Sequence, residues 1–265
     1  MRAWGIALNY LPGRVNVLGV GISAVNTAQV LEAIWGRVAA RSKVYVCVAA
    51  VHSVLECRND PDVRRVFNHS DLTTPDGMPL VWLSRLAGHR HVDRVYGPDL
   101  MLAVCRDGLP RGCRHFFYGG GPGIAEQLAD RLRKRFPGIA IAGISTPPFR
   151  EMSPQEKEAV DGAINEAQPD IVWVGLGTGR QESWMAERRS HIEAPVLIGV
   201  GAAFDFLSGH KPQAPRWMQR SGLEWLFRLA TEPRRLWPRY RQYPLFVLLV
   251  LAQMLGLRRY PLPED

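Results

Sequence analysis

Short apolar runs alternate along the chain with longer stretches in which apolar residues recur at helical spacing. The short runs are rich in β-branched and aromatic residues and predict strands at residues 15–20, 43–50, 115–118, 139–143, 171–175 and 195–200. Helical spacing predicts helices at residues 23–41, 53–68, 80–86 and 124–136, and another that begins at Ser153. This order is typical of an α/β fold, with a Rossmann-like, mainly parallel sheet flanked by helices.

Three of the predicted strands run directly into glycine-rich turns, at residues 119–123, 175–179 and from Gly201. Ligands of open α/β sheets bind at the carboxyl ends of strands, and backbone N–H groups in such turns suit phosphate. A single turn of this kind is more often a plain connection between strand and helix. Two of them together, one beside Gln181, favour a nucleotide-sugar diphosphate. Neither turn has the spacing of a dinucleotide fingerprint, which leaves an oxidoreductase as the weaker alternative.

Positive charge is concentrated at the C-terminal end of the chain. The formal net charge is +8, and residues 211–265, with ten basic and four acidic residues, carry +6 of it. Such a segment suits phosphate-bearing partners or an anionic membrane surface, and no nucleic-acid partner is expected. We therefore expect two domains, a nucleotide-sugar-binding domain at residues 1–210 and an appendage at residues 211–265.

The appendage also contains the longest apolar stretch, residues 243–257. As a helix it would span roughly 22 Å, less than the ~30 Å hydrocarbon core of a bilayer. Trp and Tyr alternate with Arg just before it, a composition typical of a helix lying in the membrane interface. We expect no signal peptide and a peripheral protein at the cytoplasmic face of the inner membrane. The alternatives are a basic helix that only packs on the domain, and a non-catalytic membrane-binding module.

Metal and disulfide chemistry find little support in the sequence. The four cysteines form no C-x-x-C pair, and the histidines form no H-E-x-x-H motif. The segment from Asp60 to Asp62 is nominally a D-x-D motif, but its helical, polar surroundings favour a capped turn or helix start. We expect neither a metal nor a cofactor.

Asp76 is the strongest candidate for chemistry. It lies in a Pro-Asp-Gly turn between apolar or small residues, with no Lys or Arg from Asp71 through Ser84. Arg94 follows it at the start of the segment ending at Asp99. A carboxylate in such a turn suits a general base. The residues leave two alternatives open: a carboxylate that only bonds the backbone of its own turn, and an Arg94 that only pairs with Asp99.

Together these residues resemble the WecG/TagA/CpsF family of glycosyltransferases, family 26. The matched motifs occur in family order over about residues 15–241, and they are residues 75–77, 94–99, 118–120, 175–177 with 181–182, 204–206 and 220–225. The resemblance implies an inverting, metal-independent hexosyltransferase. Its donor would be a UDP-sugar and its acceptor a sugar on a polyprenyl-diphosphate carrier, in the synthesis of surface polysaccharide or exopolysaccharide.

The resemblance also implies roles for individual residues. Asp76 matches the catalytic base, with Arg94 beside it, and the appendage would close over the active site at the membrane. The residues expected to bind substrate are Ala50, Gly77, Gly97, Asp99, Gly119, Gly120, Gly177, Gln181, Asp205, Arg228, Arg235 and Arg239. Among these, Gln181 would lie near the sugar and diphosphate, while Arg228 and Arg235 would reach the diphosphate.

Three positions depart from the family pattern. Ala50 stands where family members usually carry Asn, which removes a donor and an acceptor next to the sugar. Gly179 replaces a usual Pro, and Pro238 occupies an appendage Arg position, with Arg239 adjacent. The identity of the donor sugar, the acceptor and the oligomeric state, a homo-oligomer included, stay open.

Overall fold

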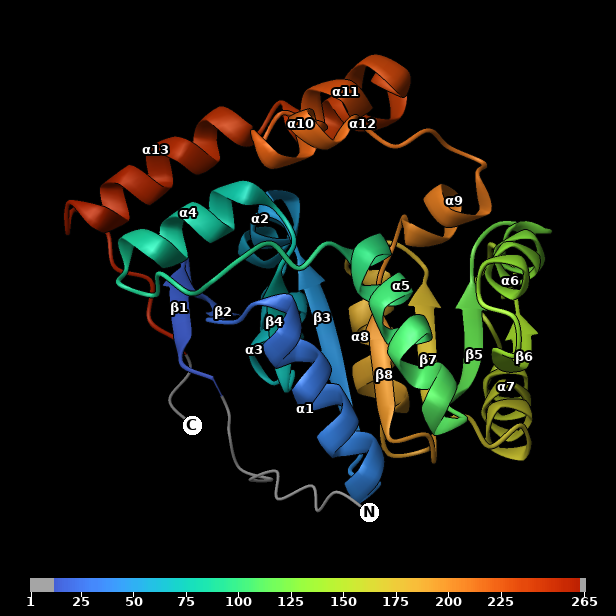
Figure 1. Cartoon of the computed structure of the whole chain (residues 1–265). Coiled ribbons are helices and arrows are strands. Elements are labelled where there is room, and N and C mark those ends of the chain that lie inside the picture. Colours follow the sequence, from blue (N-terminus) through green and yellow to red (C-terminus); the bar gives the residue numbers. More distant parts are fainter. Residues whose placement is uncertain (1–11, 263–265) are drawn as a thin grey trace.

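A parallel sheet forms the centre of the molecule. The computed structural model describes residues 12–262, and its main sheet has six strands in the order β4-β3-β8-β7-β5-β6. Every neighbouring pair is parallel. The strands are β3 (Val44–Ala49), β4 (Leu72–Pro75), β5 (Arg114–Gly119), β6 (Ala140–Ser145), β7 (Ile171–Gly175) and β8 (Val196–Gly199). The predicted α/β fold with a mainly parallel sheet is confirmed (Figure 1).

Alternate residues of the strands divide the core into two apolar clusters, because successive side chains of a strand point to opposite faces. On one face Val46, Trp173 and Ile198 pack with helices α1 (Thr27–Ala40), α5 (Gly97–Gly108) and α6 (Ile124–Arg135). On the other face Cys47 and Val174 pack with α2 (Val51–Asn59), α3 (Pro61–Asn68) and α8 (Arg180–Arg188). Further elements are η1 (Leu109–Arg111) and α7 (Pro154–Glu166), whose N-cap Ser153 accepts a bond from the backbone of Glu156.

The first predicted strand, residues 15–20, is confirmed only in part. The segment is an antiparallel hairpin outside the main sheet, with strands β1 (Arg14–Val17) and β2 (Val20–Ser23). Leu18 and Gly19 have φ of 53° and 85° and form its turn. Positive φ at both central residues is the geometry of a tight hairpin turn. The apolar residues on both sides of Gly19 concealed this turn.

Two other segments differ from the prediction. The single helix expected at residues 53–68 divides at Asp60, whose side chain accepts bonds from the backbone N–H groups of Asp62 and Val63 at 2.9 and 3.2 Å. The helix-start interpretation of this motif is thereby confirmed. Strand β4 was not predicted at all, and α4 (Met78–Leu86) follows it directly. Helix α5 begins at Gly97, within the segment that Arg94 opens.

Helices from the C-terminal region arch over the carboxyl ends of the strands (Figure 1). After α9 (Ala203–Ser208) come α10 (Arg216–Arg220), α11 (Glu224–Thr231), α12 (Pro233–Tyr240) and α13 (Tyr243–Met254). Phe246, Leu249 and Val250 of α13 join the apolar core, and Gln253 bonds the backbone of the N-terminal hairpin. Within residues 12–262, none of the helices has the length and apolar character needed to cross a bilayer.

Candidate active site

A polar cleft of about 400 Å³ opens at the carboxyl ends of the central strands, beneath the C-terminal helices. It is formed by the turns after β5, β7 and β8 and by side chains of α11 and α12. Of the residues expected to bind substrate or act in catalysis, those that line it are Asp76, Gly97, Gly120, Gly177, Gln181, Asp205, Arg228, Arg235 and Arg239. This is where open α/β sheets bind their ligands.

A second pocket of about 60 Å³ adjoins the cleft. Ala50, Gly77 and Arg94 line it, together with residues that the sequence did not single out for the site: His52, Trp225, Tyr240 and Tyr243. Asp76 and Arg228 line both spaces and therefore stand at the junction between them. Gly119 and Asp99, two further expected residues, line neither the cleft nor this pocket.

The glycine-rich turns bring the backbone close to the cleft. Gly119 has a φ of 124°, and a Cβ there would stand 2.5 Å from the carbonyl oxygen of Gly175 on the neighbouring strand. Only glycine fits this crossing, which explains its place at the end of β5. Gly177 has a φ of 86° with open space around it, so its backbone faces the cleft unobstructed. The sequence placed these turns correctly at the ends of β5 and β7.

Asp76 occupies the turn between β4 and α4, and backbone bonds fix its position. Its N–H donates to the carbonyl oxygen of Ala49 at 2.7 Å, and its own carbonyl oxygen accepts a bond from Arg94 Nε. The side chain is 23% exposed, while Oδ1 is buried and has no hydrogen-bond partner among the described residues. The carboxylate is therefore not engaged by the backbone of its own turn.

The surroundings of Asp76 favour a protonatable carboxylate. Burial, and after it the negative charge of Glu224, raises the pKa of Asp76 to about 7, although Arg94 and Arg228 act in the opposite direction. A reference aspartate, with a pKa near 3.9, is fully ionised at neutral pH and accepts protons weakly. A base whose pKa lies near the working pH transfers protons most effectively. Asp76 thus has the proton affinity that a general base needs.

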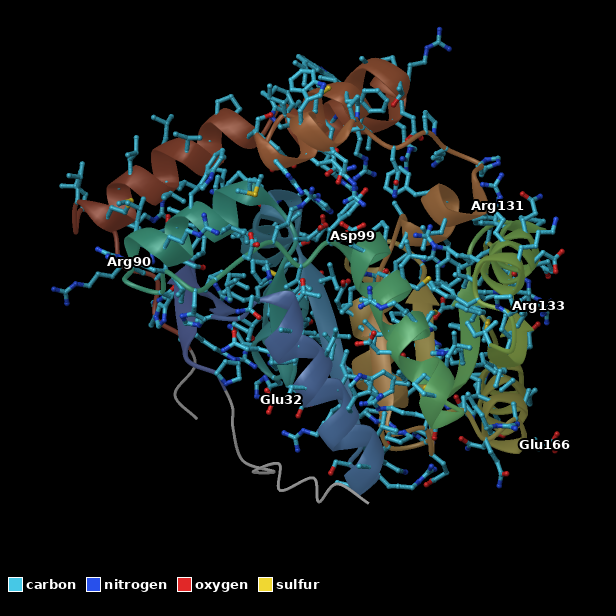
Figure 2. The ribbon with its side chains drawn as sticks, in the orientation of Figure 1. Glu32, Arg90, Asp99, Arg131, Arg133 and Glu166 are labelled. Atoms are coloured by element: carbon cyan, nitrogen blue, oxygen red, sulfur yellow. The ribbon has the colours of Figure 1, made fainter. Side chains whose placement is uncertain are left out.

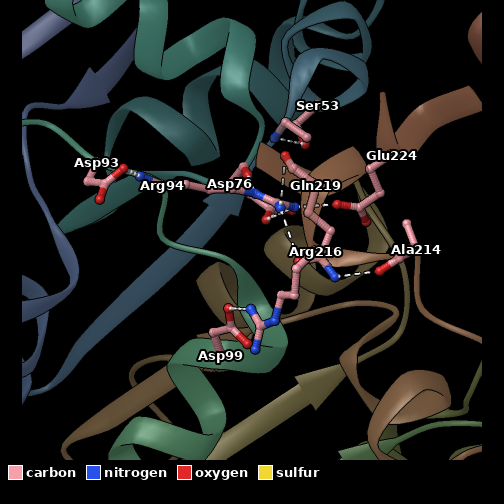
Figure 3. Close-up of polar contacts among 10 residues, drawn as sticks. Ser53, Asp76, Asp93, Arg94, Asp99, Ala214, Arg216, Gln219 and Glu224 are labelled. Carbon is pink, nitrogen blue, oxygen red and sulfur yellow. Dashed lines mark hydrogen bonds and ion pairs between the residues drawn. The ribbon is translucent and has the colours of Figure 1, made fainter. Parts of the chain in front are cut away.

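Arg94 connects the Asp76 turn to the C-terminal helices (Figure 3). Its Nη2 donates to Glu224 Oε2 on α11 and lies 3.6 Å from Asp76 Oδ1. Its guanidinium also stacks over the ring of Tyr96 at 4.1 Å. The alternative pairing with Asp99 is wrong, because Asp99 pairs with Arg216 at 2.6 Å (Figure 3). Figure 2 shows Asp99 on α5, on the side of the C-terminal helices.

Positive charge converges on the cleft from the C-terminal region. Lys211 pairs with Asp205 at 2.8 Å and with Glu232 at 3.1 Å. Arg228 lies over the ring of Phe206 at 5.4 Å, and its buried Nε has no hydrogen-bond partner in the described part of the chain. An unsatisfied buried guanidinium donor at a cleft suits an anionic ligand. The cleft can accordingly hold a diphosphate.

Hydrogen bonds of Gln181 and its neighbour Glu182 stabilise the turn after β7. Gln181 is almost fully buried, and its Oε1 accepts a bond from the N–H of Gly201 at 2.9 Å. Glu182 accepts from the N–H of Gly179 at 2.7 Å, and burial raises its pKa to about 7. The first bond joins the turn after β8 to α8, and the second fixes the turn after β7.

Sequence reasoning missed Glu224 as part of the site, although the motif at residues 220–225 contains it. The available signal was its charge, because acids are few in this basic segment. Two of them, Glu224 and Glu232, turn out to bind Arg94 and Lys211 at the site. Among residues 12–262 there is no cluster of three His, Cys, Asp or Glu side chains that could hold a metal ion.

Comparison with known proteins identifies the family. The family model described as Glycosyl transferase WecG/TagA/CpsF family matches residues 15–260. The chain belongs to this family. Relatives from Bacillus spizizenii and Bacillus subtilis are each 33% identical, over 196 and 206 residues. The first alignment covers 74% of both chains, and the second covers 77% of this chain and 78% of the relative.

Both relatives are named N-acetylglucosaminyldiphosphoundecaprenol N-acetyl-beta-D-mannosaminyltransferase. Membership in the WecG/TagA/CpsF family confirms the resemblance noted from the ordered motifs, and it makes this protein a glycosyltransferase. The two alternatives, an oxidoreductase and a non-catalytic membrane-binding module, are thereby set aside.

Proposed function

We propose that this glycosyltransferase transfers a hexose-type sugar from a UDP-sugar to a sugar on a polyprenyl-diphosphate carrier, with inversion and without a metal. One observation carries the proposal: Asp76 stands where the cationic cleft meets the smaller pocket. A donor diphosphate in the cleft and an acceptor hydroxyl in the pocket would meet at its carboxylate. The names of the two Bacillus relatives favour N-acetylmannosamine as the sugar and a lipid-diphosphate N-acetylglucosamine as the acceptor.

The proposed reaction is a single displacement. As the acceptor oxygen attacks the anomeric carbon, Asp76 takes the hydroxyl proton, and the bond from that carbon to the UDP oxygen breaks. Negative charge gathers on the departing diphosphate. Arg228, Arg235 and Arg239 line the cleft where this charge would develop. Preorganised cations in a partly dry cleft stabilise such charge more strongly than water does.

The same proposal includes peripheral binding to an anionic membrane surface. Residues 211–265 would form the appendage that binds it. The face of α13 away from the core exposes Leu248 by 65%, and Leu255 and Leu257 beyond the helix by 72% and 77%. Arg258 and Arg259 follow at once and line a surface cavity with Arg58 and Arg64. An apolar strip bordered by arginines is suited to the interface of an anionic bilayer, on the cytoplasmic side where UDP-sugars are made.

The direct experiment offers a panel of UDP-sugars together with a lipid-diphosphate N-acetylglucosamine and measures UDP release and product stereochemistry. We expect one UDP-sugar to support release that depends on the acceptor, with inversion at the anomeric carbon. EDTA should leave the rate unchanged. Release with no acceptor requirement, retention of configuration, or strict dependence on Mn²⁺ would each contradict part of the proposal.

A further inference from the structure

Arg94 forms its hydrogen bonds with the backbone of Asp76 and with the C-terminal helices. Nε donates to the backbone oxygen of Asp76 and Nη2 to the carboxylate of Glu224. Nη1 lies 3.4 Å from both the backbone and the side-chain oxygen of Gln219. Three of its nitrogens thus donate to the Asp76 backbone and the C-terminal helices, as Figure 3 shows, while the Asp76 carboxylate has only an ion pair with Nη2, at 3.6 Å.

This distribution matters because an arginine beside a carboxylate normally binds it. Arg94 Nη2 is 3.6 Å from Asp76 Oδ1, beyond hydrogen-bonding distance, yet a small rotation of the guanidinium would close the gap. A charge-assisted bond there would stabilise the ionised carboxylate and weaken it as a proton acceptor. Glu224 accepts from this same nitrogen and thereby fixes the orientation of the guanidinium at the longer distance.

We propose that Glu224 is a positioning residue that holds Arg94 away from the Asp76 carboxylate, so that the base is active only while α11 is docked. The proposal rests on the assignment of Asp76 as the base and adds a regulation to it. When α11 leaves, Arg94 loses the competing carboxylate, and its ion pair with Asp76 closes from 3.6 Å to a hydrogen bond. Docking of the appendage and activation of the base are then one event, which would limit turnover to enzyme whose C-terminal helices are in place.

The charges around Asp76 determine in which direction its pKa moves when Glu224 is removed. Arg94 faces it from the segment before α5, and Glu224 and Arg228 face it from α11. Tyr96 and Tyr243 stay neutral, because burial raises the pKa of each hydroxyl well above its usual value. His52 in the adjoining pocket is also neutral, since burial lowers its pKa. Removal of the Glu224 charge therefore leaves the positive charges of Arg94 and Arg228 acting on Asp76.

The test compares the pH dependence of kcat/KM for wild type and Glu224→Gln. Wild type should lose activity as the pH falls through about 7, where Asp76 becomes protonated. In Glu224→Gln the midpoint should move down by roughly one pH unit, the lower end of the effect of a nearby opposite charge. The plateau should fall roughly tenfold, since a weaker base transfers protons more slowly. Glu224→Asp, which keeps the charge, should lie between the two.

Arg216→Gln is the matched control. It removes another ion pair between the C-terminal helices and the body, the 2.6 Å contact with Asp99, without touching Arg94. Its pH midpoint should equal that of wild type. A purely structural Glu224 would lower activity at every pH with an unmoved midpoint, and that outcome would overturn the proposal.

A direct titration covers the case in which Glu224→Gln has too little activity to measure. The ¹³C carboxyl resonance of Asp76, assigned by its absence in Asp76→Asn, should titrate at lower pH in Glu224→Gln than in wild type. Equal titration midpoints would also reject the switch. If instead Asp76→Asn keeps normal turnover, the base assignment itself fails, so the two failures are distinguishable.

Discussion

Arg228 on α11 and Arg239 on α12 face the same cleft, close enough for their charges to interact. Burial and, to a lesser degree, the positive charge of Arg228 lower the pKa of Arg239. Two arginines held near each other in a cleft repel, and a bound anion would relieve that repulsion. The repulsion within this pair supports the proposal that the cleft binds the diphosphate of the donor.

Replacement of Arg239 by Gln should weaken UDP binding by roughly 10- to 100-fold. A hydrogen bond to a charged group contributes about 1.5–3 kcal/mol, which corresponds to that range. Isothermal titration calorimetry with UDP measures it. Arg241→Gln removes the same charge from an exposed position just after the helix and should bind UDP almost normally. Equal losses in both variants would indicate a general charge effect instead of a site.

Replacement of Ala50 by Asn should stabilise the protein. Ala50 is the N-cap of α2, with extended backbone and no side-chain bond to the first turn. An Asn side chain there can accept a bond from a free N–H of that turn, worth about 1 kcal/mol, or roughly 2–4 °C in Tm. Differential scanning calorimetry should show this gain for Ala50→Asn and none for Ala50→Val. Because Ala50 lines the smaller pocket, we also expect Ala50→Asn to change the order of preference within a UDP-sugar panel.

The raised pKa of Asp76 should make folding stability depend on pH. Between about 4 and 7 the folded protein holds a proton on Asp76 that the unfolded chain has released, so the free energy of unfolding falls as pH rises through this window. Asp76→Asn cannot ionise and escapes the loss. A pKa raised from 3.8 to about 7 corresponds to roughly 4 kcal/mol at pH 8, so the Tm of this variant should exceed that of wild type by several degrees there and by less at pH 5. If the difference in Tm stays constant or reverses between these two pH values, the pKa of Asp76 does not lie near 7.

Leu248→Glu should weaken vesicle binding while leaving the fold intact. Leu248 is 65% exposed on α13, and burial of a leucine side chain contributes about 1.5–3 kcal/mol, so affinity for anionic vesicles should fall at least roughly tenfold. Gln127→Glu on α6 makes the same change of charge on an exposed position far from α13. Co-sedimentation with phosphatidylglycerol vesicles compares the two. Equal binding by both variants would place the membrane contact elsewhere.

Local patterns predicted most of the sheet but not all of its strands. Strands β3, β5 and β7 are dense in apolar residues and were predicted within a residue or two. Strand β4 was missed because its centre is polar: Thr73 and Thr74 are buried, and their hydroxyl groups bond backbone oxygens of Phe67 and Cys47. Buried hydroxyls satisfied by distant partners have no local signature.

For the site, too, the local sequence predicted some residues, whereas contacts between residues far apart in the chain were missed. Asp76 stood out through its charge-free surroundings, and the glycine turns through their positions after strands. The contact between Arg94 and Glu224 joins residues 130 positions apart, and no pattern along the chain connects them. The ion pair between Asp99, which was expected to bind substrate, and Arg216 likewise joins residues far apart in the sequence.

Single-turnover measurement with Asp76→Asn tests the central claim most directly. Enzyme in excess is mixed with the UDP-sugar and lipid-diphosphate acceptor at pH 8, while calorimetry monitors UDP binding separately. The account predicts normal UDP affinity and a chemical step slower by at least roughly a hundredfold, the usual contribution of a general base. A rate near that of wild type, with binding equally intact, would contradict the assignment of Asp76 as the base.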